Sequence, residues 1–344
     1  MTGTLFAELP RPQATDSLPL PNTDATMLDM DRVARHIEQA GKLQRYGGPD
    51  DPLTYLLNTK CLVEIDGQRY ATLAGLLCFG RDPQVLMPHA VVDLGHYRGV
   101  EQTSFEVAHL EKNIGGTLFD QVTRIESYLW LNIHHGMTIA QGSFKRVDLH
   151  EYPQIVIREL CANMLAHRDY YHASARCRVM LFKDRIEWVS PGGLPPGLTI
   201  DNILNEQAAR NPVVLQVYYE AGYVEAFGQG LDTVVAVLKA ENMPPPIFQD
   251  TGQSFIVTVY GRPADPFTSD GAILQLNESQ RKILALVRQK GDVASKEVYD
   301  HCSSRPRRSL QRDIAGLVDA GLIQVSGNTR AARYRPGSGE EESA

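Results

Sequence analysis

In this sequence, an acid and an amide lie four residues apart, which is the spacing that would let them act together on one face of a helix. Glu159 and Asn163 lie in the stretch RELCANMLAHRDYYH, and residues four apart share one face of a helix. A carboxylate placed in this way can polarise a water molecule, and an amide oxygen is a hard ligand of the kind that Mg²⁺ takes. An ordinary amphipathic helix would instead turn such a stripe to water, and these residues alone leave both interpretations open.

Two glycines further along the chain lie where an anion could bind, just before a predicted helix. Gly228 and Gly230, in FGQGLD, directly precede the apolar helical sequence LDTVVAVL. Free backbone amides and the helix dipole favour anions at a helix start, and glycine lets a phosphate approach the backbone closely. The pair therefore predicts a phosphate loop at the start of a helix.

Four strings follow one another between residues 153 and 260: RELCANMLAHRDY, DRIEWVSPGGLPPGL, ARNP and FGQGLD. In this order and at these distances they resemble the GHKL family of ATP-binding domains, which has the fold of gyrase B, the heat-shock chaperone of 90 kDa and histidine kinases. More closely, they resemble the branch that is labelled RecG-related C-terminal or found behind Schlafen/AlbA-type domains in transcriptional regulators. The resemblance implies a GHKL-like (Bergerat) α/β sandwich that binds ATP with Mg²⁺.

The resemblance also implies roles for single residues. Glu159 would be the catalytic base and Asn163 the magnesium ligand. The implied nucleotide-binding residues are Asn163, His167, Ser190, Gly192, Gly193, Gly228 and Gly230. Ser190, Gly192 and Gly193 would form the adenine-side loop, and Gly228 and Gly230 the triphosphate loop.

The sequence departs from the family pattern at two places. Ser190 stands where the family has an aspartate that reads the adenine amino group, and a hydroxyl carries no charge. The string AHRD replaces the acid that usually follows the asparagine. His167, Arg168 and Asp169 either form a polar cluster at the end of the helix or only place a favourable charge there.

Charge is concentrated at the C-terminal end of the chain. Residues 278 to 336 hold twelve Lys and Arg against six Asp and Glu, a net charge of +6, which leaves −13 for the remainder of a chain whose total is −7. This asymmetry indicates one module that faces nucleic acid, attached to an acidic body.

The same segment predicts three short helices and a strand ribbon, in SQRKILALVRQKG, ASKEVYDHC, PRRSLQRDIAGLVDAGLI and IQVSGNTRAARYR. This pattern resembles a winged helix-turn-helix, whose recognition helix meets the major groove of double-stranded DNA. The expected DNA-binding residues are Arg307, Arg308, Gln311 and Arg312 on that helix and Arg330 and Arg333 in the wing. Winged helices also dock proteins, so this alternative stays open.

Composition sets the organisation of the chain. The expected fold class is α/β (α+β), divided into a disordered leader at 1–25, an N-terminal α/β domain at 26–150, the GHKL-like domain at 151–262, a linker at 263–276, the winged helix at 277–336 and a disordered tail at 337–344. No run of eighteen apolar residues and no secretory start are present, so a membrane span is not expected. Five scattered cysteines without a CxxC pair indicate reduced thiols in a cytoplasmic protein, without structural zinc.

These features predict a nucleotide-binding, DNA-binding regulator in which the GHKL-like core gates the winged helix. Two alternatives are a weak ATPase that remodels DNA or a protein partner, and a degenerate scaffold without hydrolysis. A RecA-type helicase motor is excluded, because the phosphate cradle GxxxxGK[ST] does not occur. A homodimer is expected by analogy with GHKL domains.

Overall fold

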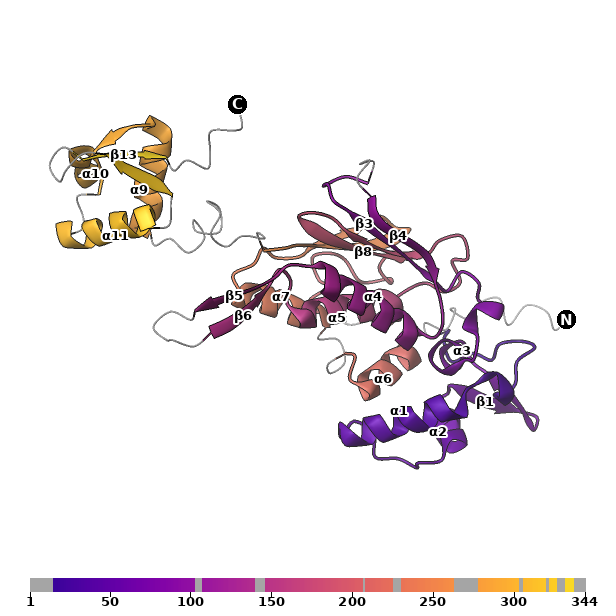
Figure 1. Ribbon diagram of the computed structural model, residues 1–344. Coiled ribbons are helices and arrows are strands. Elements are labelled where there is room, and N and C mark those ends of the chain that lie inside the picture. The colour runs from indigo at the N-terminus through magenta and orange to yellow at the C-terminus, as the bar shows by residue number, and fades with distance from the viewer. Residues whose placement is uncertain are drawn as a thin grey trace. The chain divides into compact units, whose positions relative to one another are not determined.

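In a computed structural model of the chain, the described residues are 15–102, 107–139, 146–206, 208–224, 230–262, 278–302, 306–319, 322–326 and 332–336. Contacts between residues divide the chain into unit 1, Met1–Gly261, and unit 2, Arg262–Ala344. Figure 1 labels the elements of both units, and each unit is described by itself. The predicted linker at 263–276 and the predicted tail at 337–344 lie outside the described residues.

Unit 1 begins with a layer of small elements. They are η1 (Ala25–Met27), α1 (Met30–Lys42), α2 (Pro52–Asn58), β1 (Leu62–Ile65), β2 (Gln68–Ala71), α3 (Leu73–Phe79) and η2 (Pro83–Val85). Helix α1 starts where the Asp29 carboxylate accepts hydrogen bonds from the backbone N–H groups of Asp31 and Arg32, which satisfies two amides that a helix start leaves open. Its buried residues, Val33, His36, Ile37 and Ala40, recur at helical spacing on one face.

A mixed six-stranded sheet forms the centre of unit 1. Its order is β4-β3-β7-β8-β10-β9, and all neighbours are antiparallel except the parallel pair β3 and β7. The strands are β3 (Val92–Tyr97), β4 (Val107–Ile114), β7 (Cys177–Leu181), β8 (Arg185–Pro191), β9 (Ile247–Asp250) and β10 (Ser254–Tyr260), and a separate hairpin pairs β5 (His135–Ile139) with β6 (Arg146–His150).

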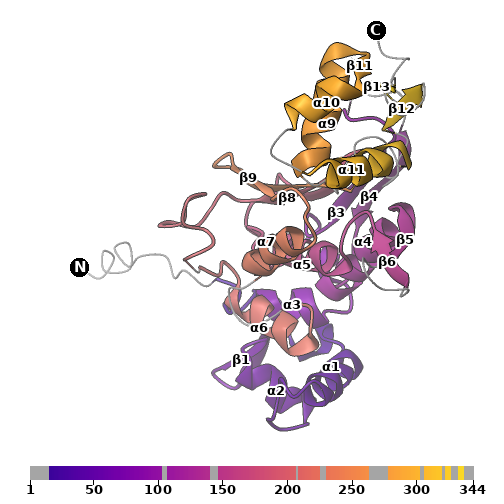
Figure 2. The ribbon, with the colours of Figure 1, turned by 90° about the vertical axis from the view of Figure 1, so that its left-hand side faces the viewer.

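Helices cover one face of this sheet. They are α4 (Leu118–Asn132), α5 (Gln154–Ala166) and α7 (Gly230–Ala240), and α6 (Pro212–Ala221) contacts α5, α1 and α3. Figures 1 and 2 show α4, α5 and α7 beneath the sheet, with α1 and α2 beyond α6. The helix that carries the acid and the amide, α5, is therefore enclosed between the sheet and neighbouring helices.

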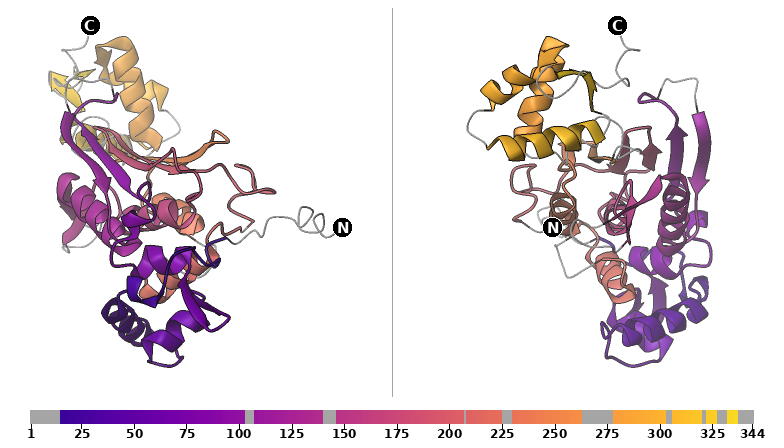
Figure 3. Two further views of the ribbon diagram at one scale, coloured as in Figure 1. Left: turned by 90° about the vertical axis from the view of Figure 1, so that its right-hand side faces the viewer. Right: turned by 60° about the vertical axis from the view of Figure 1, so that its left-hand side comes forward.

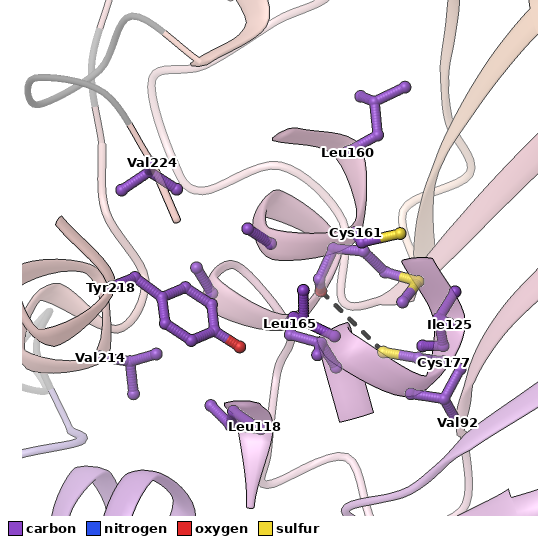
Figure 4. Packing of buried hydrophobic residues seen from close by; sticks show 14 of the residues in the cluster. Val92, Leu118, Ile125, Leu160, Cys161, Leu165, Cys177, Val214, Tyr218 and Val224 are labelled. Carbon is purple, nitrogen blue, oxygen red and sulfur yellow. Dashed lines mark hydrogen bonds between the residues drawn. The ribbon is translucent and has the colours of Figure 1, made fainter. Parts of the chain in front are cut away.

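One hydrophobic core joins the parts that the sequence analysis assigned to two domains. Strand β3 comes from the predicted domain 26–150, and it pairs with β7 of the predicted domain 151–262. Figure 4 shows Val92, Leu118, Cys177 and Tyr218, from both ranges, in a single cluster of buried side chains. The predicted boundary at residue 150 does not separate two cores, because the sheet continues across it.

The predicted disordered leader also differs from the structure in its last residues. Asp16 is fully buried, and its carboxylate accepts hydrogen bonds from the backbone N–H groups of Val213 and Val214 at 2.9 and 3.0 Å. It thereby caps the start of α6, whose own N-cap residue, Asn211, makes no such bond. The polar composition of 15–25 suggested disorder, but the burial of Asp16 and its hydrogen bonds to the start of a distant helix fix this part. Residues 1–14 lie outside the described range.

Unit 2 consists of three helices and a small antiparallel sheet. Its elements are α9 (Glu278–Lys290), β11 (Val293–Ala294), α10 (Ser295–His301), α11 (Arg307–Asp319), β12 (Ile323–Ser326) and β13 (Arg333–Pro336), and the sheet order is β11-β13-β12. They are the orange and yellow elements of Figure 3. Leu310, Ile314 and Leu317 of α11 point into a core that unit 2 forms by itself, with Ile283 and Val287 of α9.

Among the described residues, no helix combines the length and the apolar composition that crossing a membrane requires.

Candidate functional site

A cavity of about 330 Å³ lies in unit 1 between the sheet and the helices. Its wall contains six of the residues that the sequence analysis assigned to nucleotide binding: Asn163, His167, Ser190, Gly192, Gly193 and Gly230. They come from α5, from β8 and the turn after it, and from the start of α7. The seventh, Gly228, lies outside the described residues.

The start of α7 packs directly against the acid and the amide of α5. A Cβ added at Gly230 would lie 2.5 Å from Asn163 Nδ2 and 3.0 Å from Glu159 Oε2. Any larger residue at this position would push the Asn163 amide aside, because a real Cβ does not approach other heavy atoms as closely as 2.5 Å. Glu159 is fully buried and lies behind this contact rather than in the cavity wall, whereas Asn163 reaches the cavity.

The turn after β8 needs its two glycines for different reasons. Gly192 has a φ of +96°, and a Cβ there would lie 2.7 Å from Cβ of Asp169. A Cβ at Gly193 would lie 2.9 Å from the backbone oxygen of Gly252. That oxygen belongs to the turn between β9 and β10. The turn at residues 192–193 is therefore held against a hairpin.

The hydroxyl of Ser190 donates its hydrogen bond inside the protein. Its hydroxyl donates to the backbone oxygen of Met164 on α5 at 2.7 Å, and the side chain is buried. Ser190 lines the cavity, and a hydroxyl oxygen can accept a hydrogen bond but carries no negative charge.

The three polar residues at the end of α5 separate rather than cluster. His167 lines the cavity, and its pKa is lowered to about 4 because its ring is desolvated and, secondarily, because the guanidinium of Arg210 is near. Arg168 is fully buried and donates to the backbone oxygens of His89, Val91 and Ala175. His167 is therefore neutral at pH 7, and Arg168 has a structural role.

The remaining residue of the three, Asp169, pairs with Arg210, and their oxygen and nitrogen atoms are 3.6 Å apart. Arg210 also donates to the backbone oxygen of Gly193. Asn211 is buried and donates at 2.8 Å to the backbone oxygens of Ala166 and Arg168, which are left open where α5 ends. The string ARNP thus fixes the glycine turn and the end of α5, which the sequence analysis did not assign to it.

Apolar side chains complete the cavity. Trp188 and Phe255 come from the sheet, Leu160 and Met164 from α5, and Leu231 from α7. The Trp188 Nε1 donates to Cys161 Sγ at 3.4 Å, which satisfies the polar atom of this buried ring. A largely apolar cavity with a few convergent polar groups is suited to a flat heterocycle that carries a polar tail.

The donor set near Gly230 is small but of the type that Mg²⁺ accepts together with phosphates. It consists of the Asn163 amide in the cavity wall, with the buried Glu159 carboxylate behind it, and Mg²⁺ commonly uses one or two protein ligands beside phosphate oxygens and waters. In the described part of the chain, no group of three or more His, Cys, Asp or Glu side chains is placed to hold a metal ion. All five cysteines are buried and free of disulfides.

In unit 2, the predicted DNA-binding residues fall into two groups. Arg307, Arg308, Gln311 and Arg312 are exposed on the first turns of α11. Arg333 in β13 instead forms an ion pair with Asp292 at 2.8 Å, and Arg330 lies outside the described residues.

Part of unit 1 matches a family of ATPase-like domains. Residues 174–259 match the family model described as "Putative ATP-dependent DNA helicase recG C-terminal". The matched range contains β7, β8, α6, α7, β9 and β10, and it omits α5 and all of unit 2. The match therefore includes Ser190 and the glycines of the cavity wall, but not Glu159, Asn163 or His167.

A solved structure has a similar fold. It is the crystal structure of the DIP2311 protein from Corynebacterium diphtheriae, with a TM-score of 0.58, 18% sequence identity and 94% of this chain covered. This chain spans 64% of the length of that one. No curated protein sequence matches the chain.

Proposed function

We propose that unit 1 binds a nucleotide, ATP together with Mg²⁺, in the cavity. The observation that carries this proposal is the convergence of α5, the glycine turn after β8 and the start of α7 on one cavity of about 330 Å³. The match of residues 174–259 to an ATPase-like domain family supports it. We also propose that the sheet and its helical layer are a GHKL-like fold.

Each part of the cavity suits one part of the ligand. The apolar wall of Trp188, Phe255 and Leu160 would hold the base, and the start of α7 at Gly230 would face the phosphates, because a helix start favours anions. Asn163 would hold Mg²⁺, which neutralises phosphate charge when it is bound. Glu159 lies next to Asn163, and this neighbourhood supports the alternative of weak hydrolysis, with Glu159 as the base that orients water.

A thermal-shift panel tests nucleotide binding. ATP, ADP and GTP are compared, each with and without Mg²⁺, for the wild type and for Asn163→Ala. A ligand that binds only the folded state must raise the melting temperature. We expect an ATP response that requires Mg²⁺ and that Asn163→Ala abolishes, with little change in the melting temperature without ligand. An equal ATP response in both proteins would remove this site assignment.

For unit 2 we propose a winged helix that binds double-stranded DNA. Three observations support it: the order of three helices and a strand ribbon, the net charge of +6 on residues 278–336, and the exposed residues Arg307, Arg308, Gln311 and Arg312 on one part of α11. Arg308 and Arg312 have no ion pair within the described residues, so they are available for phosphates. Arg330 and Arg333 would act in the wing.

The two proposals together make the protein a regulator in which nucleotide binding in unit 1 gates DNA binding in unit 2, as a cytoplasmic homodimer. A gel-shift assay with DNA duplexes of random sequence at two salt concentrations, with and without Mg·ATP, tests this. Binding that weakens with salt and responds to ATP is the expected result. No shift at low salt would turn unit 2 into a protein-docking module and end the regulator proposal.

A further inference from the structure

Part of the cavity wall comes from α6 and the residues that follow it. Tyr219 of α6 and Val224 line the cavity on this side, and Val224 precedes Gly230, a third lining residue, by six positions in the chain. The position of this wall depends on how the C-terminal end of α6 is fixed.

Helix α1 and the residues after it hold the end of α6. The last carbonyl groups of a helix have no partner inside the helix. Gln39 Nε2 donates to the backbone oxygen of Ala221 at 2.8 Å. Arg45 Nη1 donates to the backbone oxygens of Tyr219 and Val224 at 2.9 and 2.8 Å. The N-terminal layer thus adds side-chain donors at an end that α6 already closes with its own backbone, where the N–H of Gly222 donates to the oxygens of Tyr218 and Tyr219.

Arg45 makes the contact that reaches the cavity. Its guanidinium lies over the ring of Tyr219, 4.9 Å from the ring centre, and it bonds the backbone of both lining residues of this wall. Leu43 packs against Gly222, where α6 ends in a left-handed residue with a φ of +83°. The Arg45 side chain therefore fixes both the position of the Tyr219 ring and the path of the backbone at Val224.

A buried polar network fixes the same part of α6 from α1 and α2. The Tyr55 hydroxyl donates to Glu220 Oε2 at 2.5 Å, and His36 Nε2 lies 3.2 Å from the same oxygen. All three side chains are buried, and Gln216 donates to the other oxygen of Glu220 at 2.7 Å. This network anchors α6 without touching the cavity, so loss of Arg45 frees the wall while the helix remains docked.

We propose that Arg45 is a positioning residue that holds the Tyr219 and Val224 wall of the cavity in place, so that the α1–α2 layer determines how tightly the site binds its nucleotide. This inference rests on the proposed function for its ligand, but the position of the wall can be measured without one. Arg45 acts through backbone oxygens and a ring, and no part of it lines the cavity.

The test uses the fluorescence of Trp188, which lines the cavity. The chain has two tryptophans, so a Trp130→Phe background leaves Trp188 as the only one. In this full-length background, Arg45→Met removes the donors and Arg45→Lys retains a charged donor without the planar stacking group. Lys42→Met is the matched control, because Lys42 is exposed at the end of α1 and, among the described residues, its ion pair is with Glu38.

Two quantities are measured for each protein: the acrylamide quenching constant of Trp188 without ligand, and the dissociation constant of Mg·ATP by calorimetry. We expect Arg45→Met to raise quenching about twofold and to weaken Mg·ATP binding about tenfold, the scale of one charge-assisted hydrogen bond. Arg45→Lys should lie between, and Lys42→Met should match the background. Circular dichroism spectra and thermal melting curves show whether each variant is folded.

Two results would overturn the inference. One is an Arg45→Met variant whose quenching constant and Mg·ATP dissociation constant equal those of the Lys42→Met control. The other is an Arg45→Lys variant as impaired as Arg45→Met, since positioning by donated hydrogen bonds requires partial rescue. If the background protein itself binds no Mg·ATP, the proposed function fails, and the quenching comparison still decides whether Arg45 holds the wall.

Discussion

Replacing Gly230 by alanine tests the contact between α7 and α5 on which the candidate site depends. The added Cβ would lie 2.5 Å from Asn163 Nδ2, whereas ordinary contacts begin at 3.4 Å, so the amide must move by about 0.9 Å, the difference between the two distances. Glycine to alanine in an uncrowded helix stabilises by about 0.5–1 kcal/mol, and crowding a packed site costs about 1–3 kcal/mol. The net change in the free energy of unfolding is then small, but the amide that would hold Mg²⁺ is displaced.

The effect on ligand binding is larger than the effect on stability. A displacement of about 1 Å in a site can cost about 10²-fold in function, and even a tenfold loss of affinity removes about 1.4 kcal/mol of the stabilisation that a ligand provides. For a domain of this size we expect the Mg·ATP-induced rise in melting temperature to shrink by roughly 3–6 °C.

The assay is thermal melting with and without Mg·ATP. Gly41→Ala is the control, because Gly41 lies in α1 with no atom within 4 Å of an added Cβ. It should raise the melting temperature slightly and keep the full ATP response. The reasoning would be refuted by a Gly230→Ala protein that responds to Mg·ATP as the wild type does, or that is stabilised like the control.

Three further predictions concern charge and chemistry. Glu159→Gln should keep ATP binding and lower phosphate release by about 10²–10⁴-fold, measured against a buffer blank; no release from the wild type would end the hydrolysis alternative. Because the pKa of His167 is lowered to about 4 in the folded protein, the unfolded chain binds its proton first as pH falls. The wild type should therefore lose stability between pH 6.5 and 4 relative to His167→Gln, by at most about 3 kcal/mol in urea unfolding, and parallel curves would contradict this. Replacing Arg307, Arg308 and Arg312 together by alanine should reduce the slope of log affinity for DNA against log salt by about 0.9 for each lost phosphate contact, and an unchanged slope would exclude α11 from the interface.

Local patterns in the sequence were sufficient for the elements that carry the candidate site. The helical spacing of Glu159 and Asn163 predicted α5, and the glycines before an apolar run predicted a helix start, which the structure has at Gly230. These predictions succeed because helix periodicity and helix starts depend on residues within a few positions of each other. The three helices and the ribbon of unit 2 were predicted from the same kind of pattern.

The sequence also named six residues of the cavity wall, but only through motif resemblance. Nothing in the spacing of Ser190, Gly192 and Gly193 shows that they face Asn163, since that depends on how β8 packs on α5. The string ARNP was recognised without a role, because the bonds of Arg210 to Gly193 and of Asn211 to Ala166 join positions 17 and 45 residues apart.

Tertiary structure alone decided how the N-terminal region belongs to the site. The pairing of β3 with β7 merges two predicted domains, and the burial of Asp16 at the start of α6 orders part of a predicted leader across 197 positions. The hydrogen bond from Arg45 to the backbone oxygen of Tyr219 joins residues 174 positions apart. A single sequence carries no periodic signal for such contacts, because each depends on one side chain that meets backbone groups which only the folded chain brings within reach.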